Sequence, residues 1–167
     1  MHNAFRLPLI MTLALSLSGC PSALHMAAYK GNTEKMNHLL DAGADINAHT
    51  IKFLDSLTPL HTAINTNKIE AVQLLVERGA DLNALDVDGN PPLCKAILFE
   101  RREEIVKILL TAGSNPDMFC HWDNRFMPAL AWAKEMEKPQ IVKWLQEAIA
   151  EKTSLDRGPK TNSRFHQ

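Results

Sequence analysis

The sequence lacks the short motifs on which common enzyme sites depend. No HExxH, paired CxxC, GxSxG or glycine-rich phosphate loop occurs in the 167 residues. The acidic segment 86–90 also lacks the long loop and closing glutamate of a calcium site. We therefore expect a protein that is not an enzyme, with no metal, no cofactor and no small-molecule substrate.

The chain also has no marked excess of either positive or negative charge. The chain has 18 Lys and Arg against 19 Asp and Glu. Between residues 21 and 150, which leaves out Arg6 and the four basic residues of the tail, the balance is 13 basic against 17 acidic side chains. Because binding to a phosphate backbone needs a basic stripe, we do not expect this mildly acidic body to bind nucleic acid.

A long hydrophobic run occurs only near the start of the chain. Arg6 precedes an apolar run from Leu7 to Leu17, and small residues follow as far as Cys20. This order is typical of a secretory signal peptide, and as a helix the run covers only about half of a ~30 Å hydrocarbon core. The end of the run resembles a bacterial lipobox, whose cysteine is acylated and becomes the N-terminus. We predict a signal peptide over 1–19 and lipid attachment at Cys20.

This leader predicts a lipoprotein of the bacterial cell envelope that faces the periplasm. Pro21 follows the cysteine, and the absence of Asp there favours the outer membrane by resemblance to enterobacterial sorting. Two alternatives stay open. One is a plain secretion signal without lipid, and the other is a cytosolic form that starts at Met11 or Met26.

Cysteine is scarce, and only Cys94 and Cys120 remain after Cys20. In an oxidising compartment these two are free to pair. Nothing in the sequence fixes their Cα separation near the ~5.5 Å that a disulfide needs. The simplest interpretation makes Cys94 a small buried residue and Cys120 a loop residue, and a disulfide stays open as the alternative.

The rest of the chain is organised around the segment Leu57–Asn83. Thr58 is placed to cap a helix that begins at Pro59, and apolar residues at i, i+3, i+6 and i+7 from Ile69 indicate a second helix. Gly79 is suited to end that second helix. The unit is therefore a pair of helices joined by a short turn.

Related segments precede and follow this unit at intervals of 33 to 36 residues, which indicates an array. We predict four copies, at 21–56, 57–90, 91–127 and 128–150. The last copy is polar and has no terminal glycine, as is typical of a repeat that caps an array. Residues 151–167 are polar and lack an apolar period, so we expect a disordered tail there.

Three short motifs carry a family resemblance. TPLHTA stands at Thr58–Ala63, while GADIN and GADLN stand at Gly43–Asn47 and Gly79–Asn83. They resemble the ankyrin repeat, which implies an all-α solenoid of about four helix-turn-helix repeats over residues 20–150, with turns that project between repeats. The resemblance also implies that His25 and His61, at the histidine of this motif, are structural and bond local backbone.

In this family the first helix of each pair and the projecting turns line the side that binds partners. The turns over 48–57 and 118–127 are three residues longer than the turn over 84–90 and carry apolar side chains, which often mark an interface. The alternative is that these insertions pack over neighbouring helices, above all at Phe126. The residues that we predict to bind a partner are Tyr29, Ile51, Phe53, Leu54, Leu98, Phe99, Phe119, His121, Trp122 and Trp132.

These expectations favour an envelope-anchored module that binds a protein. It resembles the small ankyrin-repeat lipoproteins that act as immunity proteins against a secreted toxin, such as a phospholipase effector of type VI secretion. One alternative is a periplasmic scaffold or chaperone for an endogenous envelope enzyme. Another is an enzyme that uses Cys120, His121 and Asp123, although such neighbours in sequence are more typical of a solvated loop.

Overall fold

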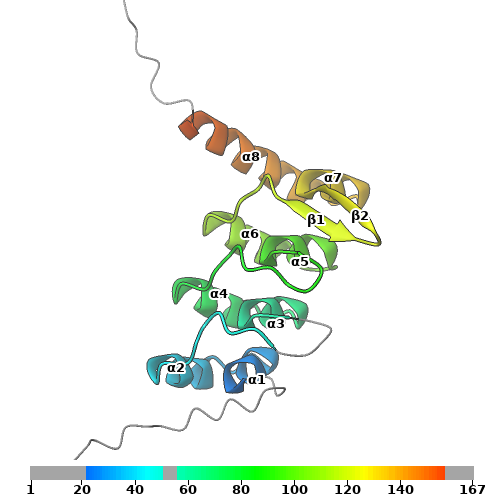
Figure 1. The fold of residues 1–167 in the computed structure, drawn as a ribbon. Coiled ribbons are helices and arrows are strands. Elements are labelled where there is room, and N and C mark those ends of the chain that lie inside the picture. Colours follow the sequence, from blue (N-terminus) through cyan, green and yellow to red (C-terminus); the bar gives the residue numbers. More distant parts are fainter. Residues whose placement is uncertain (1–21, 51–55, 157–167) are drawn as a thin grey trace, which may run out of the picture.

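A computed structural model of the chain describes residues 22–50 and 56–156. These residues form eight helices and one sheet of two strands (Figure 1). The predicted signal peptide over 1–19, Cys20 and residues 157–167 of the predicted tail lie outside the described residues. Three residues of the predicted binding set also lie outside them, namely Ile51, Phe53 and Leu54.

The helices come in consecutive pairs that follow the sequence repeat. The pairs are α1 (Ala23–Lys30) with α2 (Thr33–Asp41), α3 (Pro59–Asn65) with α4 (Ile69–Glu77), α5 (Pro92–Leu98) with α6 (Glu103–Thr111), and α7 (Ala129–Glu135) with α8 (Pro139–Asp156). The ankyrin-type helical solenoid predicted from the sequence is confirmed.

Local chemistry explains where the helices begin. The hydroxyl oxygen of Thr58 accepts the backbone N–H of His61 at 3.3 Å, and Pro59 occupies the first position of α3, where no donor is lost. Ser22 caps α1 by accepting the N–H of His25. The predicted N-cap at Thr58 is therefore confirmed.

The turn inside each helix pair contains one residue in the left-handed region. Gly31 has a φ of 70°, and the corresponding residues Asn67, Arg101 and Glu137 have φ values of 56°, 56° and 53°. Glycine adopts this conformation freely, whereas a residue with a Cβ does so at a cost. The three later turns therefore carry backbone strain that the first turn avoids.

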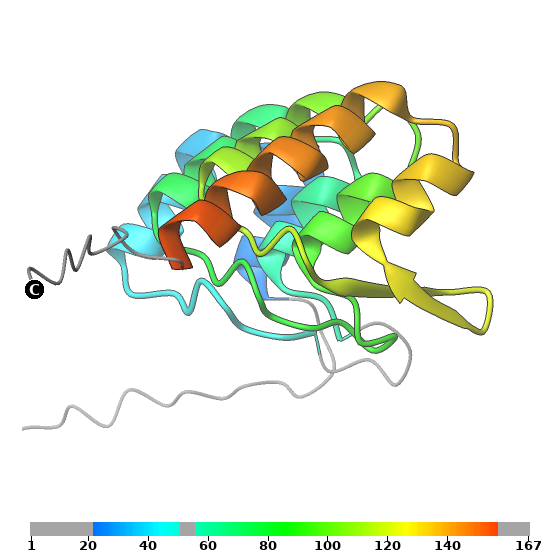
Figure 2. The same cartoon turned by 90° about the horizontal axis from the view of Figure 1, so that it is seen from above.

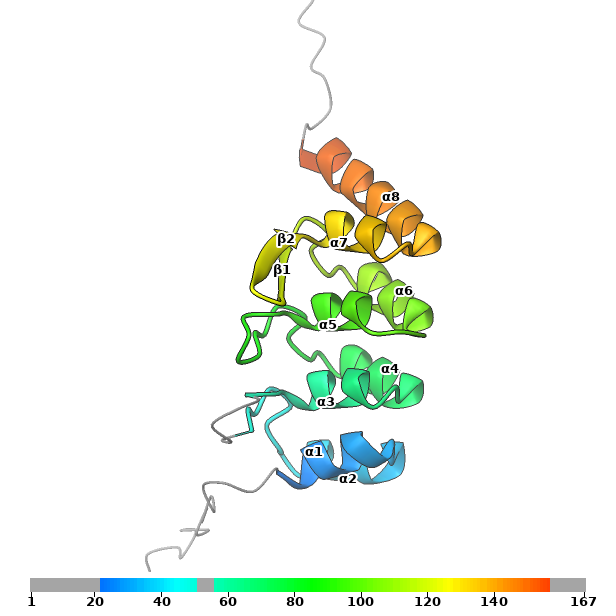
Figure 3. The ribbon, with the colours of Figure 1, turned by 90° about the vertical axis from the view of Figure 1, so that its right-hand side faces the viewer.

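The first and second helices of the pairs form two parallel layers (Figures 1 and 2). In the inner layer, α1, α3, α5 and α7 contact one another in order, and α2, α4, α6 and α8 do the same in the outer layer. The core between them contains fully buried leucines from successive repeats, among them Leu60, Leu75, Leu93, Leu109 and Leu145. Figure 3 shows that the connections between pairs project beyond the inner layer.

The third connection differs from the projecting turn that the sequence predicted. It forms an antiparallel hairpin of β1 (Phe119–Trp122) and β2 (Arg125–Pro128), in which Phe119 pairs with Pro128 and Trp122 with Arg125. Asp123 and Asn124 form its tip with φ values of 49° and 56°. A two-residue turn of this type matches the twist of the strands and favours Asn and Asp.

The C-terminal boundary also differs from the expectation. We predicted disorder from residue 151, but α8 continues to Asp156. Lys152 explains part of this extension, because its Nζ lies 2.8 Å from Asn115 Oδ1 and 3.0 Å from Asp117 Oδ2 of the preceding repeat. Over the described ranges 22–50 and 56–156, no helix has the length and hydropathy needed to cross a bilayer.

Candidate functional site

The connection between α4 and α5 is built around the carboxylate of Asp86. Its Oδ1 accepts the backbone N–H of Asp88 at 3.0 Å and that of Asn90 at 2.8 Å. Its Oδ2 lies 2.7 Å from Nζ of Lys95 on α5, and the same Nζ lies 3.2 Å from Oδ2 of Asp88. A lysine therefore lies between two carboxylates of the acidic segment 86–90.

His61 joins the inner helix α3 to this connection. Its Nε2 lies 3.1 Å from the carbonyl oxygen of Asn90, so Nε2 carries the proton and donates. Its Nδ1 lies 2.9 Å from the hydroxyl of Thr58. Desolvation by burial lowers the pKa of His61 to about 4, which keeps the ring neutral near pH 7.

The predicted structural role of the two histidines holds, and Nδ1 of His61 accepts the local backbone N–H of Thr58 at 3.4 Å, but each ring also has a second partner in the next connection. Nε2 of His25 lies 2.9 Å from the carbonyl oxygen of Leu57, just as Nε2 of His61 reaches Asn90 in the following connection. Burial lowers the pKa of His25 as well. Each ring thus links one repeat to the turn that leads into the next.

Three hydrogen bonds and a disulfide anchor the hairpin to the repeats. The backbone N–H of His121 donates to Oδ1 of Asn90 at 2.7 Å, and Nδ2 of Asn90 donates to the carbonyl of His121 at 2.8 Å. The indole N–H of Trp132 donates to the carbonyl of Cys120 at 3.0 Å. A disulfide between Cys94 and Cys120, with a Cα–Cα distance of 5.4 Å, ties β1 to α5.

The expectation that Cys94 is an unpaired buried residue is therefore wrong, and the disulfide that was left open is present. The hairpin lays Cys120 directly over α5, which the sequence could not show. The bond also removes the free thiol from the cluster of Cys120, His121 and Asp123. Among the described residues, no group of three or more His, Cys, Asp or Glu side chains is arranged to hold a metal ion.

Aromatic side chains lie on both faces of the hairpin, with Phe119 and Phe126 on one face and Trp122 on the other, which is the face that Cys120 turns to α5. Phe119 and Phe126 stack with ring centroids 5.0 Å apart, and Trp122 meets Phe99 edge-on with centroids 6.3 Å apart. The exposed fractions are 48% for Phe119, 41% for Trp122 and 65% for Phe126. We call these four residues, Phe99, Phe119, Trp122 and Phe126, the hairpin patch.

The structure brings together four of the predicted binding residues and separates others. Phe99, Phe119, His121 and Trp122 lie at or beside the hairpin. Tyr29 is exposed on α1, in the first repeat of the stack.

Leu98 and Trp132 are corrections to the predicted binding set. Leu98 is 7% exposed and belongs to the hydrophobic core. Trp132 is 4% exposed, because the hairpin covers it and accepts its indole N–H. The guanidinium of Arg125 lies over its ring at 5.1 Å. Neither side chain is available to a partner in this conformation.

Phe126 is the residue that sequence reasoning missed. We expected it to pack against the fourth helix pair, yet it has the highest exposure in the hairpin patch. The signal was present, because FCHW and RFMP are two short runs separated by the dipeptide Asp-Asn. Such spacing is typical of a two-residue hairpin.

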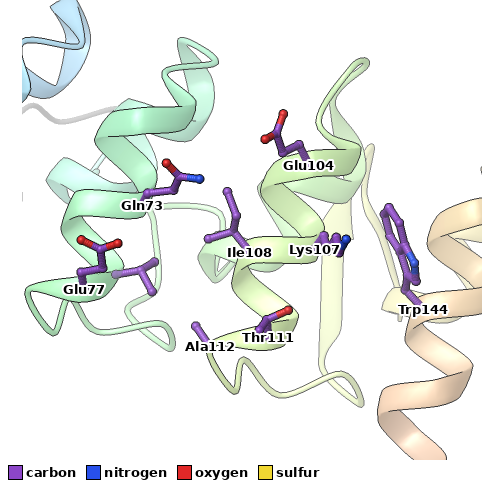
Figure 4. A pocket seen from close by; sticks show the side chains of 9 residues that line it. Gln73, Glu77, Glu104, Lys107, Ile108, Thr111, Ala112 and Trp144 are labelled. Atoms are coloured by element: carbon purple, nitrogen blue, oxygen red, sulfur yellow. The ribbon is translucent and has the colours of Figure 1, made fainter.

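A groove that the sequence did not indicate lies on the outer layer, between α4, α6 and α8 (Figure 4). It has a volume of about 630 Å³. Trp144 of α8 faces it from one side, Gln73 and Glu77 of α4 from the other, and Ile108 of α6 lies between. This groove and the hairpin patch are on opposite sides of the two-layer array.

Comparison with known proteins gives one family and two relatives. Residues 24–120 match the family described as ankyrin repeats, in three copies. Protein phosphatase 1 regulatory subunit 12A of Mus musculus and that of Rattus norvegicus are each 47% identical over 53 residues. The shared segment covers 32% of this chain and only 5% of each relative. The likeness is therefore confined to a small part of those proteins.

Proposed function

This chain belongs to the ankyrin-repeat family and is a protein-binding module, and from that premise we propose that it is an immunity protein of the bacterial cell envelope. Its partner is a secreted toxin, such as a phospholipase effector of type VI secretion. The observation that carries the proposal is the hairpin patch, a group of aromatic side chains held rigidly outside the repeat core.

The hairpin patch has the chemistry of a binding surface. Exposed apolar groups on a soluble domain often mark interfaces, and buried aromatic anchors tend to carry most of the binding energy. The disulfide at Cys120 and the double hydrogen bond at His121 fix the hairpin before it meets a partner. Little conformational entropy is then lost on association.

The disulfide also supports the proposed compartment. Disulfides persist in oxidising environments such as the periplasm and are rare in the cytosol of mesophiles. The bond between Cys94 and Cys120 therefore agrees with a leader that ends in a lipobox and with lipid on Cys20. Since α1 begins at Ala23, an acylated Cys20 would hold the array close to the membrane surface, where its effective concentration against a membrane-active toxin is high.

The proposed mechanism is occlusion. The hairpin patch packs against the toxin and covers either its active site or the face with which it docks on the membrane. The choice of a phospholipase as the target rests on a resemblance to known immunity lipoproteins in fold and in predicted location. It is an analogy, because a fold alone does not determine function. The chain itself supplies binding energy and no reaction step.

A photo-crosslinking experiment in living cells tests the proposal. A photoreactive amino acid replaces Phe126 in the hairpin patch or, as the matched control, the exposed Gln73 of the outer layer. We expect Phe126 to crosslink to a secreted toxin, Gln73 to give no such product, and a deletion strain to be killed by sibling cells. A deletion strain that survives sibling cells, together with a crosslink to an endogenous enzyme, would contradict the immunity function.

A periplasmic scaffold is the second candidate, and the outer groove favours it. Val76, Ile108 and Trp144 give this groove an apolar lining, and it opens on the layer opposite the hairpin patch. Two surfaces on opposite layers could hold two proteins together. A scaffold predicts crosslinks from both Phe126 and Gln73 to envelope proteins and a stress phenotype of the deletion in the absence of any toxin.

A further inference from the structure

A separate cavity lies between the hairpin tip and the connection that precedes α5. Its volume is about 370 Å³, and it is lined by Asp88, His121, Trp122, Asp123 and Asn124. Figure 3 shows the hairpin beside that connection on the projecting side of the array. We call this cavity the Trp122 pocket.

The carboxylates around the Trp122 pocket outnumber the cations. Asp88 and Asp123 line it, and Asp86 lies behind Asp88 in the same turn. Lys95 faces Asp86 and Asp88, at 2.7 Å and 3.2 Å, and so neutralises only one of the two. Arg125, next to the hairpin tip, is engaged by Glu135 on α7. The group of Asp86, Asp88, Asp123 and Lys95 carries a net charge of about −2.

An aromatic wall and fixed geometry accompany this charge. Trp122 is 41% exposed, and Phe99 supports its ring edge-on. The indole is the aromatic group that attracts a cation most strongly. Both sides of the pocket are fixed as well, because Asp86 accepts the N–H of Asp88 on one side and Asn90 accepts the N–H of His121, next to Trp122, on the other.

We propose that the Trp122 pocket receives an arginine side chain of the protein partner. A planar guanidinium can stack on the indole of Trp122 and donate hydrogen bonds to the carboxylates of Asp88 and Asp123 and to the side-chain oxygen of Asn124. An ammonium is compact and strongly hydrated, and it makes poorer use of a flat aromatic wall with acceptors on both sides. The inference rests on the proposed function, because it names the group by which the partner is recognised.

The test uses a small probe, so it does not need the partner. The full gene is expressed with Cys20→Ser, which removes the predicted lipid site, and the secreted chain is titrated with N-acetyl-arginine amide. The indole N–H resonance of Trp122 reports binding. We expect saturable binding that weakens by about 2- to 5-fold in Trp122→Leu, since an exposed cation–π contact contributes ~0.5–1 kcal/mol. A similar loss is expected in Asp123→Asn.

Matched controls decide the outcome. Glu70→Gln removes the same charge from an exposed site on α4 and should leave the affinity unchanged. The neutral isostere N-acetyl-citrulline amide should not bind. The proposal is overturned by equal binding of the arginine and citrulline probes, by unchanged affinity in both pocket variants, or by tighter binding of N-acetyl-lysine amide.

The two proposals fail in different ways. If the probe does not bind while Phe126 still crosslinks to a toxin, the arginine pocket is wrong and the immunity function stands. If the probe binds as expected while no toxin is found and the deletion strain survives its siblings, the pocket stands and the immunity function is wrong.

Discussion

The side-chain amide of Asn90 pairs with the backbone of His121 as a neighbouring strand would, donating at 2.8 Å and accepting at 2.7 Å. The backbone carbonyl oxygen of Asn90 accepts a hydrogen bond from the Nε2–H of His61, with an N···O distance of 3.1 Å. One buried residue therefore couples the second repeat to the hairpin. The position of the proposed binding surface depends on the repeat core through this coupling.

Asn90→Ala should loosen the hairpin. The change removes both side-chain hydrogen bonds and leaves the groups on His121 without their partner, so we expect a loss of about 1–3 kcal/mol in the free energy of unfolding. Urea denaturation measures the loss, and amide exchange at His121 should accelerate. Asn83→Ala, at an exposed position of the preceding turn, is the control. Equal stability of the two variants would contradict the coupling.

The low pKa of His61 predicts a dependence of stability on pH. Burial depresses the pKa from 6.5 to about 4, so the folded state prefers the neutral ring. The contribution of the neutral His61 ring to the free energy of unfolding is complete above pH 6.5. It is lost as the pH falls from 6.5 towards 4, because the histidine of the unfolded state binds a proton at a higher pH than that of the folded state. The total loss is about 3 kcal/mol. The lowered pKa of His25 acts in the same direction.

Urea denaturation between pH 7 and pH 5, above the range in which most carboxylates titrate, measures this dependence. The wild type should lose stability across this range, and His61→Gln should show a clearly smaller slope whatever its absolute stability. Parallel curves for the two proteins would show that His61 titrates normally.

The repeats could be predicted from the sequence because their signals are local. The Thr58–Pro59 start and the glycine stop at Gly79 act within a single turn of helix, and apolar spacing identifies each helix without knowledge of its neighbours. The same reasoning failed beyond residue 150. There, Lys152 reaches Asn115 and Asp117 in another repeat, a contact that a polar sequence does not reveal.

The binding surface was predicted only in part because its exposure depends on the hairpin. Phe119 and Trp122 were identified as apolar residues in a long connection. Whether Trp132 is open and whether Cys94 meets Cys120 both depend on where that connection folds. Alternation over two four-residue runs is a weak signal, and it did not outweigh the family expectation of a simple turn.

Arg101→Gly should stabilise the array. Arg101 has a φ of 56° in the turn between α5 and α6, at the position that Gly31 occupies in the first repeat. Glycine relieves this strain but loses more backbone entropy on folding than arginine does. The net effect should raise the free energy of unfolding by up to about 1 kcal/mol. Thermal unfolding measures the gain. Arg101→Ala, which removes the side chain and keeps the Cβ, should give no gain, and equal effects of the two changes would contradict the strain.

Lys138→Met should weaken the contact between the third and fourth repeats. Nζ of Lys138 lies 2.6 Å from the carbonyl oxygens of both Ile97 and Phe99, at the end of α5. Without the ammonium these acceptors lose a charged donor, at a cost of about 1–3 kcal/mol in urea denaturation. Lys134→Met, at an exposed site on α7, should be nearly neutral. A cost as large at Lys134 would show that the capping contact is unimportant.

Loss of the disulfide should lower stability measurably. Cys94 and Cys120 are 26 residues apart, and opening a loop of that size costs about 3 kcal/mol in the chain-entropy account. Cys94→Ala/Cys120→Ala and reduction of the wild type should shift the urea midpoint by similar amounts. Mass analysis under non-reducing conditions should find no free thiol at either position. Two free thiols in protein isolated from the periplasm would contradict the bond.

The central claim is that the hairpin patch is the surface that binds another protein. The affinity of the crosslinked partner for purified variants tests this claim most directly. Phe119→Ser/Phe126→Ser should weaken binding by at least about 10-fold, as expected when aromatic anchors are removed, with little change in the unfolding midpoint. Leu155→Ser, at an apolar site that is 75% exposed on α8, should bind as the wild type does. Unchanged affinity in the double variant, or an equal loss in Leu155→Ser, would contradict the account.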